Sequence, residues 1–208
     1  MHLNPNDLKN LDRTERILLI NSITGIKPGN LIGTVSNNGT TNLAVFSSVV
    51  HLGSDPALLG FILRPTGEVP RHTYENILEN EVYTINHIPV SHTKKAHYTS
   101  AKFDKSVSEF DRCGFTEEFI ENFKAPFVKE SLVKVGLHYC ETIEIKQNGT
   151  KMVIGEIKHI LLPKKEINFP DLNLEQCESA GISGLNSYYS FNKIDRYPYA
   201  RLNEIPEF

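Results

Sequence analysis

Two pairs of β-type segments, each joined by an Asn-Gly turn, dominate the pattern of apolar and polar residues along the chain. One Asn-Gly pair lies between residues 31–36 and 42–50, and the other between residues 132–146 and 150–162. Asn-Gly favours tight hairpin turns because both residues tolerate positive φ. The sequence therefore predicts two β-hairpins, far apart along the chain.

Further apolar segments lie between these hairpins. Residues 57–63 and 81–88 are rich in strand-forming side chains and predict two more strands. A helix is expected after Pro70, with Thr73 near its start. The spacing of its apolar residues places three side chains on one face: Tyr74, Ile77 and Leu78.

Residues 94–127 are more polar, and their pattern is mostly helical. A capping box at residues 106–109 and a stop at Gly114 predict one short helix. Thr116, followed by two glutamates, predicts a second helix that ends at Pro126. We expect this segment to lie on the rest of the fold as an excursion and not to form a separate domain.

These elements predict a mainly β protein with about six antiparallel strands and two or three short helices. Gly155 interrupts the last long strand and indicates a bulge or a barrel corner. The part of the chain from Pro163 onward is rich in loops. With no alternating βαβ pattern and no GxGxxG motif, a closed barrel or sandwich in one domain, residues 1–208, is favoured over a doubly wound sheet.

Composition narrows the function classes. The 208 residues are 39% hydrophobic and 23% charged, with a net charge of −3, so no basic excess points to nucleic acid. No apolar run approaches the ~20 residues of a membrane helix, and the polar start lacks a signal-peptide core, so a cytoplasmic protein is expected. Cysteines and histidines are scattered without metal-ligand spacing, which predicts neither disulfides nor a metal site.

One segment combines small residues, hydroxyls and guanidinium groups. The strand Ala44-Val45-Phe46-Ser47-Ser48 is followed by Arg64, Arg71 and Thr73, the last near a helix start. Two hydroxyls, two arginines and a helix N-terminus supply the donors that a phosphate monoester needs. The same residues also suit a solvated strand face with surface arginines. Residue types alone leave both interpretations open.

Several short motifs together resemble those of the flavin reductase-like, FMN-binding split-barrel family, which includes flavoredoxins and the reductase components of two-component monooxygenases. The resemblance covers roughly residues 13–190, and its motifs are specific in combination, not singly. The chain departs from the family pattern at Ala57, where proline is usual, at His72, where an acid is common, and at residues 24–28. The matching segments are Asn42–Ser47, Asp55–Ala57, Arg71–Ile77, Ile85–Asn86, residues 153–160 and residues 184–189.

The resemblance implies an FMN-binding split β-barrel of Greek-key type. It places the FMN phosphate beside Ser47, Ser48, Arg64, Arg71 and Thr73, and the flavin ring along the backbone of Ala44, Val45 and Phe46. His159 and Tyr188 are weaker candidates for contacts with the nicotinamide or the flavin face. His159 also suits a barrel-wall position, and Tyr188 a dimer contact.

The resemblance further implies an oxidoreductase that passes hydride from NAD(P)H to the flavin, with FMN preferred over FAD. Because the flavin carries the chemistry, no catalytic side chain is predicted. A homodimer with the flavin near its interface is implied, together with a monooxygenase or another electron-acceptor protein as partner. The alternatives are a flavoredoxin-like electron carrier and a non-enzymatic split barrel that holds flavin or haem.

Overall fold

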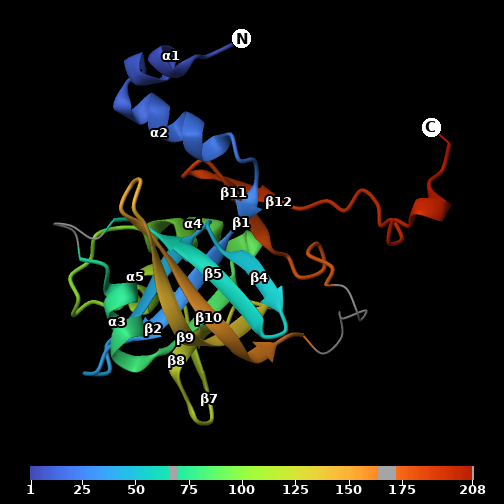
Figure 1. Ribbon diagram of the computed structural model, residues 1–208. Helices are drawn as coiled ribbons and strands as arrows, with labels where there is room; N and C mark the ends of the chain where they lie inside the picture. Colours follow the sequence, from blue (N-terminus) through green and yellow to red (C-terminus); the bar gives the residue numbers. More distant parts are fainter. Residues whose placement is uncertain (66–69, 164–171, 208) are drawn as a thin grey trace.

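The computed structural model describes residues 1–65, 70–163 and 172–207. Strand makes up 39% of the chain and helix 22%, which confirms the mainly β fold class. Seven strands form one antiparallel sheet in the order β3-β2-β6-β9-β10-β5-β4, which curls into a barrel (Figure 1). Their bounds are β2 (Asn30–Val35), β3 (Thr41–Phe46), β4 (Val50–Ser54), β5 (Ala57–Leu63), β6 (Val82–His87), β9 (Lys134–Ile145) and β10 (Thr150–Leu161).

Both predicted hairpins are confirmed. β2 pairs with β3, and β9 with β10, across the two Asn-Gly turns. The register between β9 and β10 shifts at Gly155, which confirms the bulge expected there. One boundary differs, because the apolar stretch 42–50 is not a single strand: β3 ends at Phe46, and Val50 begins β4.

Apolar side chains fill the interior of the barrel. The rings of Phe46 and Phe61 lie 5.0 Å apart and those of Phe61 and Tyr83 lie 5.8 Å apart, so an aromatic row joins β3, β5 and β6. The helix α3 (His72–Asn80) adds Ile77 to this core. Leu78, which was expected on the same face, is instead 51% exposed, since the buried face of α3 carries Thr73 and Asn76.

A second apolar cluster lies against the outer side of β2 and β3. It contains Leu31 and Leu43 from the sheet and Ala96 and Phe110 from the polar excursion. The helix η1 (Val90–His92) precedes the excursion, whose helices are α4 (Thr93–Tyr98) and α5 (Glu109–Cys113). Gly114 ends α5 with φ of 70°, as predicted. The capping box is wrong, because α5 begins only at Glu109 and that side chain bonds to β3 instead.

The predicted second helix of the excursion is wrong. Residues 117–128 form a hairpin of β7 (Glu117–Ile120) and β8 (Phe123–Val128), with Asn122 at φ 62° in the turn. Side chains at alternate positions, Phe123, Ala125 and Phe127, are buried together, which is the period of a strand. Burial of this alternating face outweighs the helix-start signal of the two glutamates. Pro126 lies within β8 and does not terminate a helix.

Both ends of the described chain extend from the barrel. Figure 1 shows α1 (Pro5–Asn10) and α2 (Arg13–Ser22) leading away on one side and the segment that carries η2 (Leu202–Glu204) on another. The part predicted as loop contains two short strands, β11 (Ala180–Ser183) and β12 (Ser187–Ser190), which form a small sheet with β1 (Lys27–Pro28). Among the described residues, no helix has the length and apolarity needed to span a membrane.

Candidate functional site

Two of the residues predicted to bind phosphate lie at the start of α3: Arg71 just before the helix and Thr73 in its first turn. Thr73 is 5% exposed, and its hydroxyl accepts a hydrogen bond from the side-chain amide of Asn42 at 3.0 Å. The hydroxyl hydrogen of Thr73 therefore stays available for a further acceptor. Asn42 belongs to β3, so this bond holds the start of α3 against the sheet edge.

Arg71 precedes α3 as its N-cap residue and makes no side-chain cap. Its Nη2 donates to the carbonyl of Pro65 at 3.3 Å. Its Nε is buried and has no hydrogen-bond partner among the described residues. A buried donor without an acceptor costs about 1–3 kcal/mol, and an anion beside it would remove that cost.

The loop after β3 carries Ser47 and Ser48, which are both half-buried. The hydroxyl of Ser48 donates to the carbonyl of Ile62 at 3.1 Å and accepts from the amide of Ile62 at 3.1 Å. Ser48 thus joins this loop to β5, near Arg64, which is exposed. Because the hydroxyl hydrogen of Ser48 is already used by Ile62, Ser47 is the better placed donor of the two.

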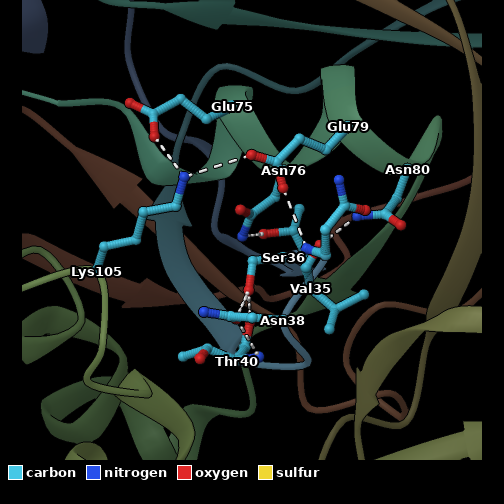
Figure 2. A network of polar contacts seen from close by, with 11 residues as sticks. Val35, Ser36, Asn38, Thr40, Glu75, Asn76, Glu79, Asn80 and Lys105 are labelled. Atoms are coloured by element: carbon cyan, nitrogen blue, oxygen red, sulfur yellow. Dashed lines mark hydrogen bonds and ion pairs between the residues drawn. The ribbon is translucent and has the colours of Figure 1, made fainter.

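A polar network fixes α3 on the hairpin of β2 and β3 (Figure 2). The amide of Asn76 donates to the hydroxyl of Thr34 at 3.1 Å, and the amide of Asn80 donates to the carbonyl of Val35 at 2.9 Å. The carboxylate of Glu79 accepts from the main-chain amide of Asn37 at 3.1 Å. Together with the bond between Asn42 and Thr73, these bonds anchor the helix from its first turn to its last residue, so its first turn has a defined position.

Lys105 ties the excursion to the same helix. Its ammonium lies 2.9 Å from the carboxylate of Glu75 and 3.5 Å from that of Glu79, one turn further along α3 (Figure 2). The neighbouring ammonium lowers the pKa of Glu75. The charge of Lys105 is therefore paired with two carboxylates, although a lysine at this place could otherwise bind a phosphate.

One cation near the site was missed by sequence reasoning. Lys151 lies on β10 opposite Leu63, the last residue of β5. Its ammonium lies 5.0 Å from the centre of the Tyr74 ring, in the first turns of α3, which is the geometry of a cation–π contact. The pairing of β5 with β10 brings Lys151 to α3, and no local sequence motif predicts this position.

The strand expected to line the flavin ring is an edge of the seven-stranded sheet. On β3, Val45 packs into the outer cluster, Phe46 faces the barrel interior, and Ala44 is half-buried opposite Ile32. The main-chain amide of Leu43 donates to the carboxylate of Glu109 at 3.0 Å. Burial raises the pKa of Glu109, since the charged form loses hydration there.

The two weaker candidates lie on other elements. The ring of His159 lies 5.0 Å from that of Phe123, on the wall covered by the β7–β8 hairpin. The hydroxyl of Tyr188 lies 3.4 Å from Nδ1 of His97, and burial raises the pKa of Tyr188 to about 12. Neither residue shares a contact with Arg71 or Thr73 among the described residues.

Residues 24–28, where the chain departs from the family pattern, serve an internal contact. Lys27 donates to the carbonyl of Asn21 at 2.7 Å and to the hydroxyl of Thr24 at 3.1 Å, so its charge lies at the C-terminal end of α2. In the described ranges, no group of three or more histidine, cysteine or acidic side chains has the arrangement of a metal site.

The donors that gather at the start of α3 fit a phosphate monoester. They comprise the guanidinium of Arg71, the hydroxyl of Thr73 and the uncapped first turn of a nine-residue helix. Ser47 and Arg64 lie on the adjoining loops. An FMN phosphate would satisfy the buried Nε of Arg71.

Solved structures with the same architecture include a flavin reductase and a flavoredoxin. A protein of Shewanella frigidimarina NCIMB 400, assigned as a flavin reductase with a split barrel domain, is 43% identical, with a TM-score of 0.92 over 96% of this chain and 100% of that one. Nitrilotriacetate monooxygenase component B from Bacillus cereus is 15% identical, with a TM-score of 0.83 over 95% and 98%. Flavoredoxin of Desulfovibrio vulgaris (Miyazaki F) is 20% identical, with a TM-score of 0.73 over 85% and 92%. The last two share the fold alone.

Sequence comparison agrees with the structural one. An uncharacterized protein of Aquifex aeolicus (strain VF5) is 27% identical over 108 residues, which is 51% of this chain and 55% of that protein. The chain thus spans about half the length of this curated relative. The profile of the flavin reductase like domain matches residues 25–174, well over half of the chain. The chain therefore belongs to the flavin reductase-like family of split-barrel proteins.

Proposed function

We propose that this protein binds FMN and acts as an NAD(P)H-dependent flavin oxidoreductase. The observation that carries the proposal is the buried Nε of Arg71, which has no hydrogen-bond partner in the described part of the chain and lies at the uncapped start of α3, beside Thr73. These donors suit a doubly charged phosphate, as family membership leads one to expect.

In this proposal each residue of the site binds or positions the cofactor. Arg71, Thr73 and Ser47 hold the phosphate, and Arg64 and Lys151 add positive charge at its edge. Ser48 keeps the loop of Ser47 fixed through Ile62. When bound, FMN accepts the hydride that leaves C4 of the nicotinamide, so that NAD(P)⁺ and two-electron-reduced flavin result.

A homodimer is part of the proposal. The segments that extend from the barrel expose apolar side chains that a second copy would bury. On α2 and just after it these are Ile17, Leu18, Ile20 and Ile23, and on the C-terminal segment they are Ile194, Tyr197, Tyr199, Leu202 and Ile205. Burial of these apolar side chains against a second copy would remove them from water, which stabilises association. A cytoplasmic location remains a prediction from the sequence.

A monooxygenase is the proposed recipient of the reduced flavin. The support is the shared fold with nitrilotriacetate monooxygenase component B, together with the sequence resemblance to two-component reductases. A flavoredoxin-like carrier, which would keep its FMN and pass electrons to a protein, is the second candidate because flavoredoxin has the same fold.

An absorbance spectrum with and without NADPH or NADH, taken without oxygen, tests the activity. Flavin bands that bleach with the nicotinamide and return in air support the oxidoreductase, while bands that persist favour the carrier. Protein that neither holds FMN after desalting nor oxidises NAD(P)H with free FMN contradicts both and leaves a non-enzymatic barrel.

Titration with FMN tests the site. Arg71→Ala is expected to weaken FMN binding at least tenfold, since a hydrogen bond to a charged group contributes about 1.5–3 kcal/mol. Arg71→Lys restores the charge but not the Nε donor and is expected to recover only part of the affinity. Arg13→Ala, on the exposed α2, is the matched control. Equal affinity in all four proteins would remove Arg71 from the site.

A further inference from the structure

A hollow of about 350 Å³, the α4–α5 hollow, is bounded by α4, by α5 and by the segment that joins them. Tyr98 of α4, Phe103 of the joining segment and Cys113 at the end of α5 form its walls. Ligand pockets in proteins commonly have volumes of about 300–1,000 Å³. The hollow therefore has room for one small organic molecule, and no residue proposed to bind FMN lines it.

Contacts between the two helices fix the walls of the α4–α5 hollow. The ammonium of Lys95 on α4 donates to the carbonyl of Gly114, the residue that ends α5, at 2.8 Å. Cys113 packs against the apolar cluster that contains the buried Ala96 of α4. The hollow is therefore largely preformed, and little conformational entropy is lost when a ligand binds there.

Two cations at the α4–α5 hollow have no partner among the described residues. The side chains of Lys94 and Arg112 both line it, and neither forms a hydrogen bond or an ion pair with a described residue. In the part of the chain that the structure describes, no carboxylate lines the hollow. Glu109 on α5 accepts from the main-chain amide of Leu43 instead, and Asp111 is exposed. The hollow thus combines apolar walls with uncompensated positive charge.

This combination of walls and charge favours an aromatic carboxylate as ligand. An aromatic ring can pack on the rings of Tyr98 and Phe103, and the sulfur of Cys113 adds a polarizable surface. The planar guanidinium of Arg112 matches the two oxygens of a carboxylate with paired hydrogen bonds. A phosphate ion would leave the apolar walls uncovered, and a neutral ring would leave both cations unpaired.

We propose that the α4–α5 hollow binds an aromatic carboxylate. The ring lies against Tyr98 and Phe103, and the carboxylate lies at Arg112 and Lys94. Cys113 lines the hollow and also packs on the apolar cluster that includes Leu43 of β3, so apolar side chains separate this site from the strand proposed for the flavin. The inference does not depend on FMN binding, since every residue that carries it belongs to the excursion.

Calorimetric titration of the purified protein with three probes tests the ligand class. Cinnamate has a ring and a carboxylate, cinnamamide is its neutral counterpart of nearly the same shape, and octanoate has a carboxylate on a chain without a ring. The wild type is expected to bind cinnamate at least tenfold more tightly than either of the others, because only cinnamate uses both the guanidinium and the aromatic walls. Equal affinity for cinnamamide overturns the recognition of a carboxylate, and equal affinity for octanoate overturns the aromatic class.

Substitution of Arg112 distinguishes a ligand contact from a structural role. Arg112→Gln is expected to weaken cinnamate binding about tenfold or more and to leave cinnamamide binding unchanged, because only the carboxylate uses the guanidinium. Lys102→Gln, which removes an exposed positive charge of the same segment outside the hollow, is the matched control. Equal losses in the two variants would reduce the effect to overall charge and overturn the site. Thermal unfolding of both variants should match the wild type, since both side chains are exposed.

Titrations with and without added FMN separate this site from the FMN proposal. Cinnamate is expected to bind equally well in both, whether or not the protein binds FMN. Cinnamate binding that FMN abolishes and that Arg112→Gln retains would place the acid in the flavin site, which overturns the proposal for the hollow and leaves the FMN proposal intact. Absence of cinnamate binding at millimolar concentrations overturns the site outright.

Discussion

The side-chain amide of Asn42 donates to the hydroxyl of Thr73 at 3.0 Å, across 31 positions of the sequence, and both residues are buried. This bond joins the edge strand β3 to the first turn of α3. It leaves Thr73 with one hydrogen to donate and fixes its direction. The strand proposed for the flavin ring and the helix proposed for its phosphate are thus held in one arrangement.

Replacement of Thr73 by valine should weaken FMN binding about tenfold or more. Valine keeps the shape of the side chain but removes the donor to the phosphate, and it leaves the buried amide of Asn42 without its acceptor, which costs about 1–3 kcal/mol of stability. Fluorescence titration of FMN gives the affinity, and urea unfolding gives the stability. Thr73→Ser, which retains the hydroxyl, serves as the control; if valine and serine bind FMN equally well, the hydroxyl has no part in the site.

Alanine substitutions of the two serines after β3 should have different effects, one on stability and the other on FMN affinity. Ser48→Ala removes both hydrogen bonds to the main chain of Ile62 and should cost about 1–2 kcal/mol of stability, with a small effect on FMN affinity. Ser47→Ala should weaken FMN binding and leave the urea midpoint unchanged. The same two measurements on both variants check this. Loss of affinity in Ser48→Ala at unchanged stability would restore Ser48 as a phosphate ligand.

Local sequence patterns predict most of the strands and turns of the barrel. Asn-Gly turns and alternating apolar residues define the hairpins, and Gly114 stops α5, because each depends on the conformational preference of one or two residues. The β7–β8 hairpin could not be recognised in this way. Glu117 and Glu118 have the pattern of a helix start. The strand forms instead because the alternating side chains of Phe123 and Phe127 are buried against the barrel wall, a contact that the local sequence does not contain.

The residues of the candidate site also fall into two groups: those that a local sequence motif predicts and those that only the packing of distant elements brings to the site. Arg71 and Thr73 come from one short motif and were found in the sequence. Lys151 reaches α3 only through the pairing of β10 with β5, so its place depends on a contact that no local pattern contains. Asn42 stood in the motif, yet its bond to Thr73 follows from the packing of α3 on β3.

Gly155 should not tolerate a side chain. A Cβ at this position would lie 2.3 Å from the hydroxyl oxygen of Tyr83, which is buried in the barrel and has no hydrogen-bond partner among the described residues. Overpacking of this kind costs about 1–3 kcal/mol, so Gly155→Ala should lower the urea midpoint. Gly53→Ala, where the nearest atom lies at 3.4 Å, should change it little.

A second substitution tests the cause. Tyr83→Phe removes the nearest obstructing atom, the hydroxyl oxygen at 2.3 Å from the new methyl group, while two ring carbons remain at 2.9 and 3.0 Å. The double variant Gly155→Ala with Tyr83→Phe should therefore recover part of the stability lost by Gly155→Ala alone, and the difference gives the coupling between the two positions. Additive effects in this cycle would mean that the backbone of the bulge, and not the contact with Tyr83, disfavours alanine.

His87 should make the protein less stable in mild acid. Burial lowers the pKa of His87 from 6.5 to about 4, and its Nδ1 lies 2.8 Å from the hydroxyl of Ser179, on the segment that leads into β11. Below pH 6.5 the unfolded chain takes up a proton at this residue that the folded chain refuses. Stability is therefore fully present above pH 6.5 and falls as the pH approaches 4, by roughly 3 kcal/mol in all and about 2 kcal/mol by pH 5.

Urea unfolding of the wild type and of His87→Asn at pH 7.5 and pH 5 measures this effect. Asparagine cannot ionise, so the variant should lose about 2 kcal/mol less than the wild type between the two pH values. His138→Asn, which changes an exposed histidine, should follow the wild type. If His87→Asn shows the same loss as the wild type, His87 is protonated as readily in the folded chain as in the unfolded one, and the acid sensitivity must come from other groups.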